Sequence, residues 1–468
     1  MRKGLTLMMA MTVKEILTAV NGTLLQGDEG TRIDCVSTDS RTVPEGSLFL
    51  PWKGERFDGH DFIDAALRGG AAGCLTARTP ETLLPGKFYI QVPDTREALK
   101  ALSTAYRSRF HIPFVQITGS TGKTTAKEMV AAVLSEHFNT LKTQGNFNGD
   151  LGTPMILLEL NKAHEAAVIE TGMDNFGQIR WLGEMVRPRF AVIINIGVAH
   201  MEFLGSQQGI LQAKSEIFEN LEPDGVAVLN GDDPLLNTVT LPQRILRCGL
   251  GENCNVRVHD VEDLGLAGIR CVVSTEKADY PLTIPAPGAH MIYPASIAVA
   301  IGEELGLTAE EICRGVAGFK NTGPRLLVER LAGGRVMLND SYNANPQSMA
   351  AALRALAAVD APKRIAFLGD MKELGDATKQ AHVDMGRLVG ELGIDTLLCT
   401  GPFCKEYMVQ AAKDAGCRDV RWYAKKDDAY GELPAAFTPG AAILLKGSHF
   451  ANRLDLAADW LREYPFAE

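Results

Sequence analysis

Short apolar runs alternate with amphipathic stretches of helical periodicity along most of the chain. The runs have the length of strands and are bounded by glycine and proline, and the stretches between them are long enough for helices. This alternation is typical of α/β proteins with open, largely parallel sheets. The apolar runs predict strands at 114–117, 166–169, 190–196, 225–229, 336–339, 364–368, 396–400 and 442–445. The predicted fold class is therefore α/β.

The pattern breaks at two places. Near 103–109, a predicted helix that carries Arg107 and Arg109 runs into Pro113, and the residue before a proline disfavours helix. The second break, at 315–324, contains a Gly-Pro step that is typical of a linker or hinge. A chain of 468 residues is also too long for one hydrophobic core. We predict domains at residues 1–108, 109–322 and 323–468, the last with the pattern of a small Rossmann-like domain.

Composition and charge exclude several classes of protein. With 46% hydrophobic and 22% charged residues, the chain has the composition of a globular protein. Its formal charge of -10 argues against a general nucleic-acid binder, because such a protein needs a basic surface to neutralise phosphates. No apolar stretch reaches the roughly 18 residues of a membrane-spanning helix. We therefore expect no nucleic-acid partner and no stable membrane insertion.

The cysteines and the N-terminal residues indicate a compartment. Nine cysteines are dispersed without a C-x-x-C pair or a zinc-ligand spacing, as expected for reduced cytosolic thiols. The short apolar stretch after Arg2 and Lys3 leads into a helix start at 12–15, so we predict no signal peptide. The prediction is a cytoplasmic protein.

A turn rich in glycine and threonine is the strongest local motif. It reads Thr118-Gly119-Ser120-Thr121-Gly122-Lys123-Thr124-Thr125 and lies between the strand at 114–117 and a predicted helix at 124–137. Small residues let backbone N–H groups close on phosphate oxygens, and the helix N-terminus adds partial positive charge. Lys123 would reach the outer phosphates, and the Thr124 hydroxyl would hold Mg²⁺. Ile117 stands where the Walker pattern has glycine, so the motif is a shortened variant, and a chance Gly/Thr turn is the alternative.

Polar residues follow the next two predicted strands. Glu170 comes directly after 166–169, and His200 comes after 190–196. Open α/β sheets gather their ligands at the carboxyl ends of strands. Singly, each residue is better explained in an ordinary way, Glu170 as a solvated carboxylate and His200 as a histidine that caps a turn. Behind a phosphate loop and on successive strands, they indicate one metal–nucleotide site.

Two further features are ambiguous from chemistry alone. Lys214 lies on a predicted amphipathic helix after Gly205, where a surface lysine is the ordinary interpretation. The segment Asp340-Ser341-Tyr342-Asn343-Ala344-Asn345-Pro346 follows a predicted strand. Its asparagines, aspartate and proline suit either a ligand site or a turn with a helix N-cap.

Together these motifs resemble the Mur ligases, the amide-forming enzymes of cell-wall precursor assembly, over essentially the whole chain. The loop from Thr118 to Thr125 looks like the family's shortened Thr-Gly-x-x-Gly-Lys-Thr form, and 143–148 is similar to the stretch after its P-loop helix. The resemblance implies ATP and two Mg²⁺ ions, with Glu170 and His200 as magnesium ligands. It also implies that Lys214 is carbamylated and thereby becomes a ligand.

Within the family, the branch that adds D-alanyl-D-alanine is the best match. Its motifs resemble 340–346, 369–375 with His382, and 446–448, while 38–41, 46–49 and 58–60 resemble the segment that receives the UDP-sugar peptide. The resemblance implies a small N-terminal α/β substrate domain, a central P-loop ATPase domain with a parallel sheet, and a C-terminal Rossmann-like domain. The implied reaction joins D-alanyl-D-alanine to UDP-N-acetylmuramoyl-tripeptide through an acyl phosphate and releases ADP and phosphate, in a monomeric enzyme.

The site residues expected from motifs and resemblance fall into four groups. For catalysis they are Lys123, Lys214, His200 and Arg325; for the nucleotide, Gly119, Ser120, Thr121, Gly122, Lys123, Thr124, Thr125, Arg325, Asp340 and Asn343; for the acid substrate, Ser40, Arg41, Asn146 and Asn148; for metal, Thr124, Glu170, His200 and Lys214. One position departs from the family: Pro294 stands where an asparagine contacts adenine, so the base would be held by stacking and backbone groups. The alternatives are another Mur-type or folylpolyglutamate-type amide ligase and a non-catalytic, nucleotide-switched binding module.

Overall fold

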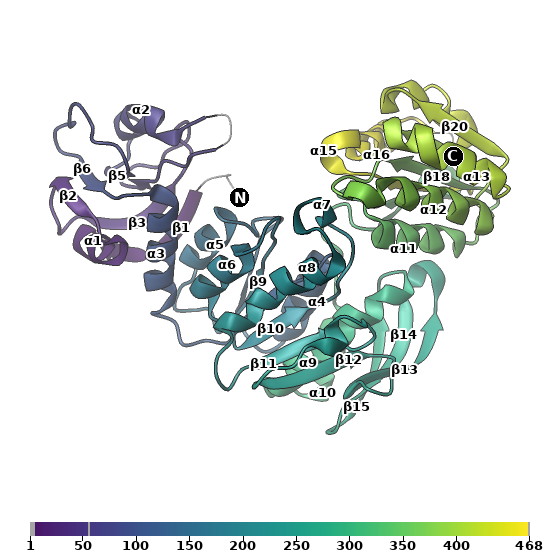
Figure 1. The fold of residues 1–468 in the computed structure, drawn as a ribbon, viewed down its shortest axis with the longest axis horizontal. Coiled ribbons are helices and arrows are strands. Elements are labelled where there is room, and N and C mark those ends of the chain that lie inside the picture. Colours follow the sequence, from purple (N-terminus) through teal and green to yellow (C-terminus); the bar gives the residue numbers. More distant parts are fainter. Residues whose placement is uncertain (1–4, 55–56, 467–468) are drawn as a thin grey trace.

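Three β-sheets, each flanked by helices, organise the chain in the computed structural model (Figure 1). The structure describes residues 5–54 and 57–466. In Figure 1 the N-terminal sheet is purple, the central sheet is teal and the C-terminal sheet is green, in chain order across the molecule. The predicted α/β class is confirmed, with one sheet in each of three domains.

The N-terminal sheet has six strands in the order β1-β3-β4-β5-β6-β2. Its strands are β1 (Leu5–Thr12), β2 (Thr23–Gln26), β3 (Arg32–Ser37), β4 (Leu48–Phe49), β5 (Gly73–Thr76) and β6 (Phe88–Gln91), and its α-helices are α1 (Val13–Val20), α2 (Ile63–Arg68) and α3 (Thr95–Arg107). The inner pairs are parallel, and the edge strands β1 and β2 are antiparallel to their neighbours. The helix start expected at 12–15 is confirmed, because Thr12 and Glu15 form a capping box on α1.

The central sheet has nine strands in the order β15-β14-β13-β12-β11-β10-β7-β9-β8. They are β7 (Phe114–Thr118), β8 (Thr140–Lys142), β9 (Ala166–Glu170), β10 (Phe190–Ile193), β11 (Val226–Asn230), β12 (Arg244–Gly249), β13 (Val256–Asp263), β14 (Ile269–Ser274) and β15 (Asp279–Ile284). All pairs from β13 to β8 are parallel, and β14 and β15 add an antiparallel extension. The extension from β12 to β15 was not among the predicted strands.

The α-helices of this domain cover the sheet and position the site. They are α4 (Lys123–Leu134), α5 (Gly152–Leu158), α6 (Gln178–Val186), α7 (Met201–Leu204), α8 (Gln207–Ser215), α9 (Ile292–Glu304) and α10 (Ala309–Ala317). Helix α9 is buried from Pro294 to Gly302, as expected for a helix that is apolar on all sides. It packs against α4, the helix that follows the phosphate loop.

The C-terminal sheet has six strands in the order β16-β17-β21-β18-β19-β20. They are β16 (Leu327–Leu331), β17 (Arg335–Asn339), β18 (Arg364–Gly369), β19 (Thr396–Thr400), β20 (Asp419–Tyr423) and β21 (Ala442–Lys446), with α11 (Pro346–Ala357), α12 (Thr378–Glu391), α13 (Val409–Asp414), α14 (Leu433–Ala436), α15 (His449–Asn452) and α16 (Leu454–Glu463). Only the edge pair β16–β17 is antiparallel. The Rossmann-like pattern predicted for this segment is therefore present, together with two strands, β16 and β20, that were not predicted.

The first two domains pack tightly on each other, whereas the third does not. Helix α3 lies against α5 and α6, and one hydrophobic cluster contains buried residues of both domains. Within that interface the Tyr106 hydroxyl donates to the Leu160 carbonyl at 2.5 Å and accepts the Met9 N–H at 2.7 Å. The C-terminal domain has its own two clusters, against which, among the residues that the structure describes, only Val198 and Leu266 pack from the central domain. In the part of the chain that is described, no helix is both long and apolar enough to cross a bilayer.

Candidate active site

The phosphate loop joins the carboxyl end of β7 to α4. Gly122 is the N-cap of α4 with φ of 75°, a left-handed conformation that favours glycine, and no side chain caps this helix. Its first N–H groups therefore remain available for an anion, in the field of the helix N-terminus. The Lys123 amine donates to the Gly119 carbonyl at 2.8 Å, so the side chain folds back over the loop. Burial lowers the pKa of Lys123, and the negative charge of Glu170 opposes that effect.

Asn195 holds the loop in shape. Its Oδ1 accepts the Thr121 N–H at 2.9 Å, and its Nδ2 donates to the Thr121 hydroxyl at 2.8 Å. The Ser120 N–H donates to the Asn195 carbonyl at 3.1 Å, and the Gly197 N–H donates to the Ser120 hydroxyl at 2.8 Å. Asn195 was not among the predicted site residues. The available signal was an asparagine between isoleucines at the end of an otherwise apolar strand.

Glu170 ends β9 and is buried beside the loop, with 1% of its surface exposed. Its Oε2 accepts the Thr124 hydroxyl at 2.9 Å, and its Oε1 accepts the Asn148 amide at 2.8 Å. Its backbone N–H donates to the Thr143 hydroxyl at 3.0 Å. Thr124 and Glu170, both predicted to bind Mg²⁺, are thus in direct contact, and their side chains offer oxygen atoms of the type that Mg²⁺ prefers. Asn148, expected at the acid substrate, holds Glu170 here.

A buried lysine that sequence reasoning missed lies beneath these residues. Lys127 has no exposed surface, and its amine donates to the Thr143 carbonyl at 2.7 Å. The same amine lies 3.0 Å from Glu128 Oε1 and 3.9 Å from Glu170 Oε2. Lys127 therefore links α4 to the segment that contains Thr143 and to the end of β9, where Glu170 lies. In the sequence it is one more lysine on a helix, one turn beyond Lys123.

His200 occupies a left-handed conformation, with φ of 63°, at the start of α7. Its Nδ1 lies 3.0 Å from Glu373 Oε2 of the C-terminal domain and 3.4 Å from Asp174 Oδ1. Neither contact has the direction of a hydrogen bond, so this buried nitrogen has no hydrogen-bond partner among the described residues. Strained conformations of this kind concentrate at functional sites.

Lys214 is buried in α8, with 1% of its surface exposed, so the interpretation as a surface lysine is wrong. Its amine makes no hydrogen bond and no ion pair within residues 5–54 and 57–466. Burial, reinforced by the positive charge of Lys123, lowers the pKa of Lys214 well below its ordinary value. An amine without a counter-ion in such surroundings is held in its neutral form.

The C-terminal domain contributes the segment 340–346 and the linker arginine. Asp340 accepts the Leu326 N–H at 3.1 Å and pairs with the buried Lys446 at 2.5 Å, while the Lys446 amine also donates to the Asn343 carbonyl at 3.1 Å. Asn345 is the N-cap of α11. The helix N-cap interpretation of this segment is therefore confirmed at Asn345, and the ligand-site interpretation stays a prediction. The guanidinium of Arg325 stacks on the Tyr342 ring at 3.9 Å.

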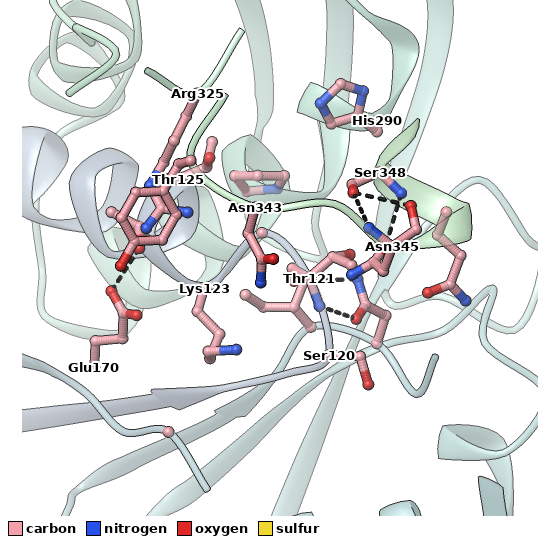
Figure 2. A pocket seen from close by; sticks show the side chains of 18 of the residues that line it. Ser120, Thr121, Lys123, Thr125, Glu170, His290, Arg325, Asn343, Asn345 and Ser348 are labelled. Carbon is pink, nitrogen blue, oxygen red and sulfur yellow. Dashed lines mark hydrogen bonds between the residues drawn. The ribbon is translucent and has the colours of Figure 1, made fainter. Parts of the chain in front are cut away.

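A cavity of about 710 Å³ lies between the central and C-terminal domains. It is lined by most of the predicted site residues: Ser120, Thr121, Gly122, Lys123, Thr124, Thr125, Asn148, Glu170, His200, Arg325, Asp340 and Asn343. Figure 2 shows Lys123 between Glu170 on one side and Ser120 and Thr121 on the other, with Asn343 opposite. Gly119, Asn146 and Lys214 are not among the lining residues.

Two predicted residues lie elsewhere, in the N-terminal domain. Ser40 and Arg41 follow β3, and the exposed Arg41 guanidinium pairs with Asp39 at 2.8 Å. Pro294, by contrast, lines the cavity. It lies near the start of α9 beside Tyr293, whose hydroxyl donates to Asp232 at 3.0 Å. The wall at Pro294 thus presents a ring and a pyrrolidine rather than an amide.

Three α/β domains, with a phosphate loop facing a cavity between the central and C-terminal ones, define a nucleotide-dependent enzyme of the P-loop class. Comparison with known families is more specific. The Mur ligase middle domain matches residues 117–302, the Mur ligase, glutamate ligase domain matches 325–449, and the Mur ligase family, catalytic domain matches 32–107. The chain belongs to the Mur ligase family.

Individual relatives agree with this assignment. The UDP-N-acetylmuramoyl-tripeptide--D-alanyl-D-alanine ligase of Bacillus subtilis is 36% identical over 97% of this chain and 98% of its own length. The crystal structure of MurF from Acinetobacter baumannii superposes with a TM-score of 0.89 at 32% identity, covering 97% of this chain and all of that one. MurF ligase from Thermotoga maritima, solved with ADP, superposes with a TM-score of 0.81 at 26% identity over 92% of this chain and 97% of that one.

Proposed function

We propose that the chain ligates D-alanyl-D-alanine to UDP-N-acetylmuramoyl-tripeptide, with conversion of ATP to ADP and phosphate. The observation that carries this function is the cavity in which the phosphate loop and Glu170 face Arg325 and Asn343 of the C-terminal domain. The relative in Bacillus subtilis carries the name of this reaction, and the Thermotoga maritima ligase was solved with ADP.

The reaction requires activation of a carboxylate. A carboxylate and an amine do not condense at neutral pH because the carboxylate has no leaving group. The terminal carboxylate of the tripeptide attacks the γ-phosphorus of ATP, an O–P bond forms, and ADP leaves. The amine of D-alanyl-D-alanine then attacks the acyl carbon, phosphate leaves with the bonding electrons, and the nitrogen loses a proton. Lys123 and Arg325 stabilise the transferring charge, and the cavity positions the reactants and excludes water.

The residues around Glu170 fit a magnesium ion. Thr124 and Glu170 offer two hard oxygen ligands 2.9 Å apart, and Nδ1 of His200 is buried with no hydrogen-bond partner in the part of the chain that is described. When bound there, Mg²⁺ neutralises charge on the phosphates. Asn148 and Lys127 keep the Glu170 carboxylate in place for this role.

Lys214 fits a second ligand only after modification. Its buried amine, which has no ion-pair partner among the described residues, can attack CO₂, form an N–C bond and release a proton. The resulting carbamate would replace a neutral amine with an anionic oxygen ligand for a second Mg²⁺. Intact-protein and peptide mass spectrometry under CO₂ tests this modification, with Lys162, an exposed lysine, as the internal control.

The remaining assignments concern the acid substrate and the assembly. The N-terminal domain, with Ser40 and Arg41, receives the UDP-sugar peptide, whose peptide then extends past Asn146 and Asn148 to the phosphate loop. The domain limits at 108 and 322 follow the ends of α3 and of the linker after α10. The protein acts as a monomer, which light scattering at assay concentration tests.

The test of the function is phosphate release from Mg-ATP with UDP-N-acetylmuramoyl-tripeptide, with and without D-alanyl-D-alanine. Release that depends on both substrates, with a product of pentapeptide mass, is expected. A substrate panel with single amino acids and folate distinguishes the other amide ligases. ATP binding without release under any combination would replace the ligase with a nucleotide-switched binding module.

A further inference from the structure

Tyr342 lies at the junction of the linker and the phosphate loop. It follows β17 in the segment 340–346, and its backbone N–H donates to the Pro324 carbonyl at 3.2 Å. Its ring lies under the guanidinium of Arg325, with Cζ 3.9 Å from the ring centroid. One residue thus contacts both the backbone and the side chain of the linker that brings the C-terminal domain to the site.

The stacking on Tyr342 constrains the orientation of the Arg325 side chain. Arg325 is half-buried and lines the cavity, and no carboxylate among the described residues forms an ion pair with it. A guanidinium stacked on an aromatic face keeps its in-plane N–H groups free to bind an anion. A salt bridge would occupy the same groups. The ring therefore holds the arginine mainly through its aromatic face, and most of the guanidinium N–H donors remain for phosphate.

Tyr342 also reaches the central domain. Its hydroxyl forms hydrogen bonds with Asn146 of the central domain and with Arg325. Burial and the negative charge of Glu170 raise the pKa of Tyr342, whereas the charge of Arg325 and these two hydrogen bonds lower it. Asn146 belongs to the loop that supplies Asn148, whose amide holds Glu170 at 2.8 Å. The ring is thus anchored on the magnesium side of the cavity while it supports the arginine from the C-terminal domain.

We infer that Tyr342 is a positioning residue for phosphoryl transfer, whose ring holds the Arg325 guanidinium toward the phosphate loop and whose hydroxyl fixes the ring to the central domain. This role rests on the function proposed for Arg325. In this role the aromatic face contributes most to the position of the Arg325 guanidinium, and the hydroxyl contributes less.

Substitutions separate the two parts. Tyr342→Leu removes the ring and is expected to lower kcat for phosphate release about 5- to 30-fold, with the KM for ATP and the affinity for ADP changed less than about threefold. Tyr342→Trp keeps an aromatic face and should retain kcat within about threefold. Tyr342→Phe keeps the ring and loses the hydroxyl, with its hydrogen bonds to Asn146 and Arg325, and should fall between them. Tyr407→Leu, elsewhere in the same domain, is the matched aromatic control and should leave kcat unchanged.

A double-mutant cycle identifies the path of the effect. If the ring acts through Arg325, Tyr342→Leu in an Arg325→Ala background lowers kcat no further, whereas independent effects multiply. Multiplying effects, a Trp variant as poor as the Leu variant, or a Leu variant with full kcat would each overturn the inference. Full kcat in Arg325→Ala alone would instead refute the role proposed for Arg325, so the two failures are distinguishable. Melting temperatures of all variants identify any loss of fold. If Tyr342→Leu does not fold, the kcat values of Tyr342→Trp and Tyr342→Phe test the inference instead.

Discussion

Replacement of Lys127 by methionine tests whether the buried charge network supports the phosphate loop. The amine has no exposed surface and contacts the Thr143 carbonyl at 2.7 Å, Glu128 at 3.0 Å and Glu170 at 3.9 Å. Methionine keeps most of the volume and removes the charge. The carbonyl then loses its partner, and the two carboxylates lose a buried cation.

The expected cost is about 3 kcal/mol. Removing one partner of a buried ion pair costs about 3–5 kcal/mol because the other charge is left uncompensated. The lower end applies here because Glu128 keeps a second cation, the Lys142 amine at 2.5 Å. The unpaired Thr143 carbonyl is part of the same cost, about 1–3 kcal/mol if it stood alone.

Hydrogen exchange is the appropriate assay because a three-domain chain does not unfold in one step. The expected cost corresponds to about 100-fold faster exchange of the most protected amides in α4 and β9. The amides of α12, in the separate core of the C-terminal domain, should not change. Lys162→Met removes an exposed lysine from the same domain and serves as the matched control.

A second substitution sharpens the interpretation. If uncompensated charge is the cause, Glu128→Gln added to Lys127→Met should restore part of the protection, although Glu128→Gln alone removes a favourable pair. A change of less than about threefold in α4 exchange for Lys127→Met would refute the reasoning, since that corresponds to under 1 kcal/mol. So would equal changes in α4 and α12, which would indicate a general loss of fold.

Three other predictions follow from contacts already described. Lys123→Met should lower kcat for phosphate release about 10²- to 10³-fold by removing a preorganised cation, and Lys162→Met should not. Burial would raise the pKa of Glu128, but the hydrogen bond from Lys142 and the charge of Lys127 lower it below 4.5; its contribution to stability is therefore complete above pH 4.5 and lost as pH falls through the folded pKa. The stability difference between wild type and Glu128→Gln in urea should accordingly be constant from pH 7 to 5 and shrink below 4.5, and a difference that grows on acidification would contradict this sign. Tyr106→Phe should cost about 1–3 kcal/mol because it strips two buried hydrogen bonds, and an unchanged thermal midpoint would show that water replaces them.

In the central and C-terminal domains, strands that are buried on both faces were predictable, and strands with one solvent-exposed face were not. β7, β9, β10, β19 and β21 are buried along their whole length, so each reads as a continuous apolar run. β15 alternates exposed and buried residues, and the unpredicted edge strands β16 and β20 are only partly buried. Because one face of each of these strands is polar, their sequences contain no continuous apolar run.

The same distinction applies to the site. Lys123, Thr124 and Glu170 were predictable because a loop, a helix start and a strand end fix their places locally. Lys127, Asn195 and Tyr342 act through contacts with segments distant in sequence, so no local pattern reveals their roles, even where the segment itself stands out. The burial of Lys214 likewise arises from the packing of α8, and only the family resemblance singled it out.

The two interdomain interfaces differ in a way that bears on catalysis. The N-terminal and central domains share an apolar core, so they behave as one body. The contacts of the C-terminal domain with the site are mainly polar: Glu373 contacts His200, and Tyr342 contacts Asn146. The amide of Gln347 lies so close to Gly197 that a Cβ added to this glycine would be 2.0 Å from Oε1. Polar contacts of this kind exchange readily with water, so they contribute little net free energy to closure without ligands. Nucleotide that contacts both Lys123 and Arg325 would favour the closed arrangement by its differential affinity for it, and the cavity would then exclude water when the acyl phosphate forms.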